Sequence, residues 1–308
     1  MWQGGAGSVM TPTAKNDLRQ ALLIHQGAIG DFLVALRLIS LCNTQFGPFR
    51  WDLLGKPPLG RLAKVLGLIE ECHDFSIPGW HLFFSPDLPI PPECQSILNR
   101  YELMINVVAG PQAHFSRRLE NTAPHRVISV EPRLPEKYSR HVYQYLAEQV
   151  MKKPVDSLPS SVCPVDSDTC LSVTQELRDR RIDPKRLMLI HPGASGENKR
   201  WPMENFLRLA DSLNRQEITP AFLLGRVELE QFDEGTIKTL EKAGTLFADW
   251  PLERLAALIS LSGQYFGNDN GVSHLAAVVG AQTQVVFVRN NAVNWKPLGP
   301  RVSVMSAN

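Results

Sequence analysis

Short apolar runs alternate with segments of helical length along most of this chain. The runs are too short for surface helices and predict buried strands. The expected strands are residues 21–25, 51–55, 103–108, 186–190, 221–225, 263–266 and 283–288. The expected helices are residues 32–42, 59–66, 139–151, 174–181, 203–213, 249–261 (with Asp249 as N-cap) and 273–279, and residues 78–92 are expected to form a loop. Because strands alternate with helices in both halves, we predict an α/β fold with two parallel, doubly wound sheets facing one another.

Residues 154–166 divide this pattern into two halves. The stretch is rich in Pro, Ser and Val and has no helical period, as is typical of a linker. We therefore expect one Rossmann-like domain over residues 18–158 and a second over residues 167–308. Residues 1–17 are mostly small and polar, and we expect them to form a loose leader.

Composition narrows the classes of partner. The chain is 44% hydrophobic and 20% charged, and its net charge of +1 gives no general attraction to nucleic acid or to an anionic membrane. The five cysteines show no C-x-x-C pair and no zinc-ligand spacing, which favours a reducing, cytoplasmic setting. No apolar run reaches transmembrane length, and the first residues do not resemble a signal peptide.

A polar turn at residues 267–271, Gly-Asn-Asp-Asn-Gly, lies between an expected buried strand and an expected helix. A strand, a tight turn and a helix N-terminus bring unpaired backbone N–H groups together, which suits an anion such as a phosphate group. An ordinary turn, with His274 as a core residue, explains the same pattern.

A second glycine-rich loop, residues 26–31 (Gln-Gly-Ala-Ile-Gly-Asp), follows the first expected strand. Its glycines lack the full dinucleotide-binding fingerprint. Asp31 would lie near the carboxyl end of a central strand, where it could act as a base toward a ligand. The same carboxylate could instead stabilise the dipole of the following helix without any chemical role.

The third loop, residues 191–196 (His-Pro-Gly-Ala-Ser-Gly), follows the first expected strand of the second half. Ser195 and the backbone near Gly196 could bind phosphate oxygens, with Lys199 as a neighbouring cation. A plain connection from strand to helix, with Lys199 in solvent, is the alternative.

A basic cluster precedes the linker and consists of Arg117, Arg118, Arg126, Arg133, Lys137, Arg140 and His141. Such clusters commonly form a solvated face. They can also bind a phosphorylated or carboxylated acceptor. On that second interpretation, Arg117 and Arg118 are the acceptor-side candidates.

Together, the loops at residues 26–31, 191–202 and 267–277 resemble, in order and spacing, the signature of glycosyltransferase family 9, which includes the ADP-heptose:lipopolysaccharide heptosyltransferases. A run at residues 140–146 is also similar to one in that family. The resemblance implies a GT-B fold, in which two Rossmann-like domains face one another across a cleft. It further implies that the N-terminal domain binds the acceptor and the C-terminal domain binds a nucleotide-sugar donor.

The resemblance also implies roles for single residues. Asp31 matches a proposed catalytic base, Lys199 a lysine that contacts the donor diphosphate or sugar, and Asp269 an aspartate that contacts the sugar. Glu228 matches a glutamate that binds the ribose. The expected donor-binding residues are His191, Gly193, Ser195, Lys199, Glu228, Asp269, Asn270, Gly271 and His274. The chain departs from the family at residues 289–295, which replace a Gly-Pro-Thr turn.

The implied reaction is inverting, metal-independent transfer of a sugar to a hydroxyl of a cell-envelope glycan or lipopolysaccharide acceptor, with ADP-heptose as the expected donor. Asp31 would accept the hydroxyl proton, and Lys199 with two helix N-termini would stabilise the departing diphosphate. We find no Asp-x-Asp pair of the type that metal-dependent glycosyltransferases use, so neither a metal nor a cofactor is expected. A lipid-linked acceptor would bring this cytoplasmic protein to the surface of the inner membrane.

Two other functions fit the same fold. A non-catalytic nucleotide-sugar-binding protein would retain the loops without turnover, although the joint presence of Asp31, Lys199 and Asp269 argues against it. A different Rossmann-like enzyme, such as a nucleotide-sugar epimerase, is the other alternative; the incomplete glycine fingerprint and the lack of an acidic residue placed to bind a nicotinamide ribose argue against it.

Overall fold

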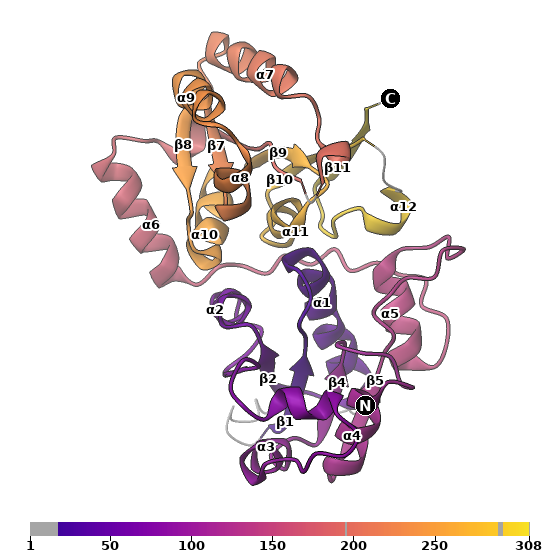
Figure 1. Ribbon diagram of the computed structural model, residues 1–308. Coiled ribbons are helices and arrows are strands. Elements are labelled where there is room, and N and C mark those ends of the chain that lie inside the picture. The colour runs from indigo at the N-terminus through magenta and orange to yellow at the C-terminus, as the bar shows by residue number, and fades with distance from the viewer. Residues whose placement is uncertain (1–17, 195, 289–291, 308) are drawn as a thin grey trace, which may run out of the picture.

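The computed structural model describes residues 18–194, 196–288 and 292–307, which form two sheets (Figure 1). The first sheet has the strand order β3-β2-β1-β4-β5, and the second has the order β11-β10-β9-β6-β7-β8. All adjacent strands in both sheets are parallel. The predicted α/β class with two parallel, doubly wound sheets is therefore confirmed.

The N-terminal half alternates strands with helices. Its elements are β1 (Arg19–Ile24), α1 (Ile29–Phe46), β2 (Phe49–Gly55), α2 (Pro57–Val65), β3 (Cys72–Asp74), the 3-10 helix η2 (Trp80–Phe84), α3 (Pro92–Leu98), β4 (Leu103–Asn106), α4 (His114–Thr122), β5 (Arg126–Ser129) and α5 (Val142–Met151). Residues 152–166 then contain neither helix nor strand, as predicted for the linker.

The C-terminal half repeats this alternation. Its elements are α6 (Ser167–Asp179), η3 (Pro184–Arg186), β6 (Leu187–His191), η4 (Glu197–Lys199), α7 (Met203–Arg215), β7 (Thr219–Leu224), α8 (Arg226–Gln231), α9 (Glu234–Ala243), β8 (Thr245–Ala248), α10 (Leu252–Ser262), β9 (Gln264–Asn268), α11 (Gly271–Val278), β10 (Gln282–Phe287), α12 (Ala292–Trp295) and β11 (Val302–Ser306). Because each half holds one sheet, we propose residues 18–158 and 167–308 as the two domains.

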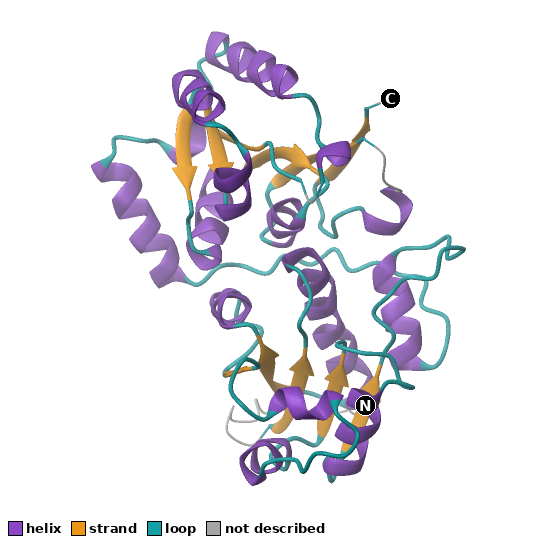
Figure 2. Ribbon diagram, viewed as in Figure 1, coloured by secondary structure: helices purple, strands orange, loops and turns teal. Residues whose placement is uncertain are grey.

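Alternating side chains of β1 cover both faces of the first sheet. Leu23 packs in one apolar cluster with Phe32 of α1, whereas Leu22 and Ile24 pack in another with Phe115 of α4. Successive residues of a strand point to opposite faces, so a fully apolar strand needs helices on both sides. Figure 2 shows these helices around the strands of each sheet.

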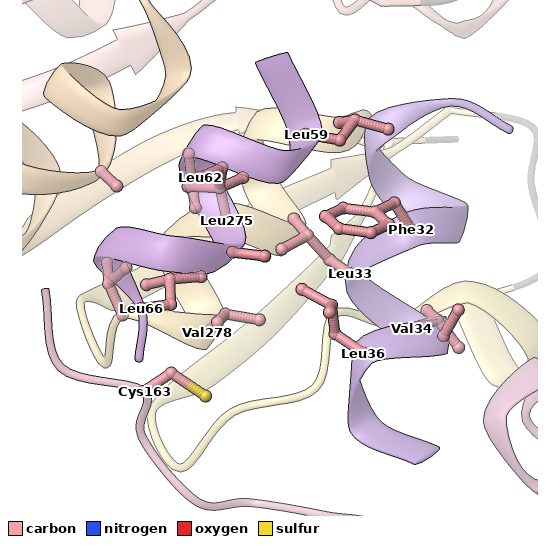
Figure 3. Packing of buried hydrophobic residues seen from close by; sticks show 14 of the residues in the cluster. Phe32, Leu33, Val34, Leu36, Leu59, Leu62, Leu66, Cys163, Leu275 and Val278 are labelled. Carbon is pink, nitrogen blue, oxygen red and sulfur yellow. The ribbon is translucent and has the colours of Figure 1, made fainter. Parts of the chain in front are cut away.

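One apolar cluster continues from the N-terminal half into the C-terminal half. Leu33 of α1 and Leu62 of α2 lie in the same cluster as Leu275 and Val278 of α11 (Figure 3). An ion pair of 2.9 Å between Arg61 Nε and a Glu253 carboxylate oxygen also joins the halves. The shared burial of apolar side chains, rather than one exposed ion pair, therefore supplies most of the free energy that holds the two halves together.

Several local predictions were wrong. Residues 78–92 contain the 3-10 helix η2 rather than only loop. Asp249 does not cap α10: its φ is 51°, it forms an ion pair with Arg226, and Pro251 occupies the N-cap position. Helix α6 begins at Ser167 rather than residue 174, because the Asp166 carboxylate caps its first turn. In the described part of the chain, no helix has the length and hydropathy needed to cross a bilayer.

Candidate functional site

The three predicted loops lie where each sheet reverses its winding direction. In the first sheet β1 lies between β2 and β4, and in the second β9 lies beside β6. Ligands of doubly wound folds bind beyond the carboxyl ends of strands at such points. In Figure 2 the arrowheads of β1, β2 and β4 point toward the C-terminal half, and those of β7 and β8 point toward the N-terminal half. The two binding edges therefore face one another.

A cavity of about 860 Å³, here called the interface cavity, lies between these edges. Its lining includes Asp31 from the first half and seven of the expected donor-binding residues: His191, Lys199, Glu228, Asp269, Asn270, Gly271 and His274. Gly193 lies behind the lining, and Ser195 lies outside the described residues. Arg226, Val227 and Leu252 also line this cavity, and sequence reasoning did not assign them.

Lys199 brings a positive charge to the interface cavity. It ends the short 3-10 helix η4 and is half-buried, and among the described residues no acidic group pairs with its ammonium. Asp269 follows β9, and its backbone N–H donates to the carbonyl of Val286 at 3.1 Å. An available cation and a carboxylate thus line the same cavity, as a nucleotide-sugar site would require.

Glu228 is buried against the loop after β6. Its Oε2 accepts a hydrogen bond from the Gly225 amide at 2.9 Å, and a Cβ on Gly193 would lie 2.0 Å from its Oε1. Only glycine at residue 193 leaves room for this carboxylate. His191 Nδ1 donates to the carbonyl of Leu223 at 2.8 Å, so Nδ1 carries the proton. Burial lowers the pKa of His191 more than the nearby Glu228 raises it.

Two asparagines tie the loop after β9 to the loop after β6. Asn268 is fully buried and donates from Nδ2 to the Pro192 carbonyl at 2.8 Å, while its Oδ1 accepts from the Trp201 amide at 2.9 Å. Asn270 donates to the Gly193 carbonyl at 2.9 Å. Its Oδ1 also caps α11 by accepting from the amides of residues 272 and 273. These two amides are therefore already satisfied, contrary to the expectation of unpaired N–H groups in this turn.

The N-termini of α1 and α11 touch across the interface. A Cβ on Gly271 would lie 1.9 Å from Ile29 Cγ2 and 3.1 Å from the Gly30 nitrogen, so this approach requires glycine at residue 271. His274 packs against Gly30 and is buried. Burial, with a smaller contribution from His141, lowers the pKa of His274 to about 4, so its imidazole is neutral near pH 7.

Asp31 also lines a second cavity, here called the N-terminal cavity, of about 660 Å³. Its side chain lines both cavities and is exposed to solvent, although neighbouring groups remove part of the hydration of its carboxylate. This desolvation raises the pKa of Asp31, and a hydrogen bond with the backbone of Ala28 offsets part of the rise. A carboxylate with a raised pKa is a better proton acceptor than a solvated one.

Trp295 is the other side chain shared by the two cavities. It belongs to a segment, residues 292–298, that starts from the C-terminal half and packs on the N-terminal half. Asn294 Nδ2 donates to the Tyr138 carbonyl at 2.9 Å, and His141 Nε2 donates to the Lys296 carbonyl at 2.8 Å. This segment includes part of the departure from the family pattern; residues 289–291 lie outside the described residues.

The basic cluster does not converge on the cavities. Arg133 is its one member that lines the N-terminal cavity among the described residues. Arg118 donates to the backbone carbonyls of Pro86 and Leu88, and Arg117 donates to Gln112 at 2.9 Å. The structure therefore places Arg117 and Arg118 outside the lining of both cavities.

Two acidic clusters bear on metal binding. The sequence does contain one Asp-x-Asp, at residues 166–168, but Asp166 caps α6 by accepting from the Thr169 amide at 2.9 Å, and neither aspartate lines either cavity. Within the described residues, one group of three potential ligands gathers: Asp52, Glu71 and His73. The Arg100 guanidinium and the Tyr101 hydroxyl already hydrogen-bond the His73 ring there, and the group lies outside both cavities.

Comparisons with known structures agree with this architecture. A glycosyltransferase family 9 protein from Veillonella parvula DSM 2008 matches with a TM-score of 0.75 and 15% identity, over 96% of this chain and 87% of the other. ADP-heptose LPS heptosyltransferase II of E. coli matches with a TM-score of 0.69 and 15% identity, over 93% and 90%. The E. coli heptosyltransferase WaaC with ADP matches with a TM-score of 0.65 and 14% identity, over 94% and 93%.

At such low identity these similarities establish the fold, which is GT-B. A search of curated proteins finds no match to this chain. The model of glycosyltransferase family 9 (heptosyltransferase) matches residues 121–308, which is more than half of the chain. The chain therefore belongs to glycosyltransferase family 9 and is a heptosyltransferase-like enzyme.

Proposed function

We propose that this enzyme transfers a sugar, with heptose the leading candidate, from an ADP-linked donor to a hydroxyl of a cell-envelope glycan or lipopolysaccharide-type acceptor, with inversion and without a metal ion. Two structural relatives bear names that mention ADP-heptose or ADP, and WaaC is also known with ADP-2-deoxy-2-fluoro heptose. Their fold, together with the charged side chains of Lys199, Glu228 and Asp269 in the interface cavity, supports the same donor here. The N-terminal cavity is then the acceptor site.

The observation that carries the proposal is the position of Asp31 in the lining of both cavities. A base for glycosyl transfer must reach the acceptor hydroxyl while that oxygen approaches the donor sugar. A residue at the junction of an acceptor cavity and a donor cavity meets both requirements.

In the proposed reaction the acceptor oxygen attacks the anomeric carbon from the face opposite the diphosphate. The new carbon–oxygen bond forms as the bond to the diphosphate oxygen breaks, which inverts the anomeric configuration. The hydroxyl proton passes to the Asp31 carboxylate, and the electron pair of the broken bond leaves with the nucleoside diphosphate.

Lys199 supplies the positive charge toward the leaving group. A preorganised cation beside protein walls of low dielectric stabilises developing negative charge more strongly than the same cation in bulk solvent. Lys199 therefore serves the purpose for which other glycosyltransferases use a divalent ion. Asp269 is the candidate for binding the sugar hydroxyls and Glu228 for the ribose. Arg117 and Arg118 lie outside the acceptor cavity and remain candidates for contact with distant parts of a large acceptor.

The proposal is tested by incubating the enzyme with nucleotide sugars and acceptor glycans and measuring nucleoside diphosphate release, with and without a chelator. We expect acceptor-dependent release that the chelator leaves unchanged, and a product of inverted anomeric configuration by NMR. Donor binding without release for any acceptor would instead identify a non-catalytic nucleotide-sugar-binding protein. Release that needs an added metal, or a retained configuration, would contradict the mechanism.

If the acceptor is a glycolipid, we expect this enzyme to be cytoplasmic and to work at the surface of the inner membrane. That location follows from the proposed acceptor rather than from any membrane-spanning helix, and vesicle co-sedimentation with and without the acceptor lipid tests it.

A further inference from the structure

The walls of the N-terminal cavity are mainly apolar. Val107 and Val108 follow β4, Leu134 belongs to the loop before α5, and Val142 and Leu146 lie on α5. The charged lining residues of this loop, Arg133 and Glu136, are exposed and therefore lie toward the mouth of the cavity. Sugars alone bury poorly against aliphatic walls, because their hydroxyls would lose hydrogen bonds to water.

Most of the other polar lining residues come from a different wall, the segment from the end of β1 to the start of α1; Asn294 of α12 is the exception. This segment contributes His25, Gln26 and Gly27, and Asp31 lies in the first turn of the helix. A molecule in this cavity would therefore place its polar end toward Asp31 and its apolar body toward β4 and α5. The volume of about 660 Å³ is in the usual range for small-molecule sites.

His25 belongs to this wall and has no role in the proposed reaction. It is 2% exposed, and its Nδ1 is buried without a hydrogen-bond partner. Its ring packs against Phe32, with 5.3 Å between ring centroids, and lies beside Gly27 and close to Asp31. An unpaired buried nitrogen is costly, and a small rotation of the ring toward a ligand in the cavity would relieve that cost by giving the nitrogen a hydrogen-bond partner.

We infer that the N-terminal cavity selects an acceptor whose reacting hydroxyl is flanked by an apolar group, and that His25 is a positioning residue that hydrogen-bonds a polar atom next to that hydroxyl. This inference rests on the proposed function, because it assigns the acceptor to this cavity. The shared chemistry is an alcohol or glycoside with an alkyl or aromatic neighbour. His25 contacts the acceptor, whereas the proton still passes to Asp31.

The test measures binding of three probes to the full chain by isothermal titration calorimetry, with ADP present. The probes are methyl, octyl and phenyl β-D-glucopyranoside, the octyl compound below its micelle concentration. We expect the octyl or the phenyl glycoside to bind at least about tenfold more tightly than the methyl glycoside, since even two buried methylene groups suffice for that ratio. Tighter binding of the octyl probe identifies an alkyl neighbour, and tighter binding of the phenyl probe an aromatic one.

Variants localise the effect. Leu134→Gln should reduce the preference for the apolar glycoside several-fold, whereas Leu171→Gln, on an exposed leucine of α6, should leave it unchanged. His25→Phe should weaken all three probes by a similar factor and leave ADP binding intact, and His25→Asn should recover part of the loss.

Equal binding of the methyl and apolar glycosides would overturn the inference, as would an apolar preference that survives Leu134→Gln. Unchanged binding of all probes in His25→Phe would overturn the assignment of His25. Absence of ADP binding in the wild type would instead contradict the proposed function, and the comparison among the glycosides would still decide the nature of the cavity.

Discussion

Loops held by buried asparagines line both cavities, but the side chains that they and their neighbours present differ. Lys199, Glu228 and Asp269 bring charges to the interface cavity, whereas β4 and α5 bring aliphatic side chains to the N-terminal cavity. Asn268 and Asn270 fix the loops after β6 and β9 through hydrogen bonds to backbone carbonyls. The loop after β4 that carries Val108 is fixed in a similar way: the buried Asn106 accepts from the Val108 amide at 3.0 Å and donates to the Ser116 hydroxyl at 2.9 Å. Under the proposed function, the charged side chains of the interface cavity recognise the donor, and the aliphatic walls of the N-terminal cavity contact the acceptor.

The largest effect is expected for Lys199→Ala, which tests the role of the positive charge in the interface cavity. We expect a loss of about 10²- to 10³-fold in the transfer rate, because removal of one preorganised donor to a developing anion has this effect in other enzymes. Lys199→Arg should retain part of the rate. The matched control is Arg200→Ala, since Arg200 is the next cation along the chain but hydrogen-bonds Gln231 and lines neither cavity. Equal losses in both alanine variants would contradict a specific role for Lys199.

Both cavities contain a buried neutral histidine, and these two residues make stability depend on pH. Burial lowers the pKa of His25 and that of His274 from 6.5 to about 4. The unfolded chain therefore binds more protons between these values, so the free energy of unfolding falls as pH decreases from 6.5 to 4. The expected loss is roughly 3 kcal/mol for each histidine across this window.

Urea unfolding at a series of pH values measures this loss. His25→Phe should flatten the dependence, whereas His81→Asn, at an exposed histidine, should leave it as in the wild type. An unchanged slope in His25→Phe would show that His25 is protonated or solvated in the folded protein.

A substitution at Gly271 alters the contact between the N-termini of α1 and α11, which lies where the two cavities meet. Gly271→Ala should cost about 1–3 kcal/mol by overpacking, because the new Cβ would overlap Ile29 Cγ2. It should also lower the rate of sugar transfer, because the loop at residues 267–271 would move away from Asp31. Adding Ile29→Ala should restore part of both losses. A double variant that is no better than the sum of the single changes would show that the two helix N-termini do not meet.

The smallest effect is expected for Arg61→Ala, which removes the exposed ion pair with Glu253. Such pairs contribute about 0.2–1 kcal/mol, and salt screens them. Chemical unfolding at low and high ionic strength measures the change. A loss well above this range would mean that electrostatics, rather than the shared apolar cluster, holds the halves together.

Much of the fold could be predicted from the sequence because the central strands are fully apolar and the loops after them carry glycine. The strands that prediction missed, β3, β5, β8 and β11, are short or partly exposed edge elements, whose pairing depends on a neighbouring strand already being in place. The beginning of α6 was missed because apolar residues are sparse in its first turns.

The order of the three loops also predicted which residues gather at the interface cavity. Long-range contacts could not be predicted in this way. Asn268 bonds a carbonyl 76 residues away, and Trp295 reaches the site through a segment that packs on α5. The sequence shows that residue 268 is an asparagine and that His25 follows β1. Only the fold shows that the Asn268 side chain is buried and joins two loops, and that His25 has an unpaired nitrogen beside a cavity.

The central claim is that Asp31 is the base shared by the two cavities. Single-turnover transfer at saturating donor, measured across pH in the wild type and in Asp31→Asn, tests it most directly, with donor affinity measured in parallel. We predict that the wild-type rate rises with pH through an acidic limb centred above the ordinary pKa of an aspartate. Asp31→Asn should lose this limb and about 10²- to 10⁴-fold in rate while donor affinity is unchanged. The same acidic limb at a near wild-type rate in Asp31→Asn would contradict the account.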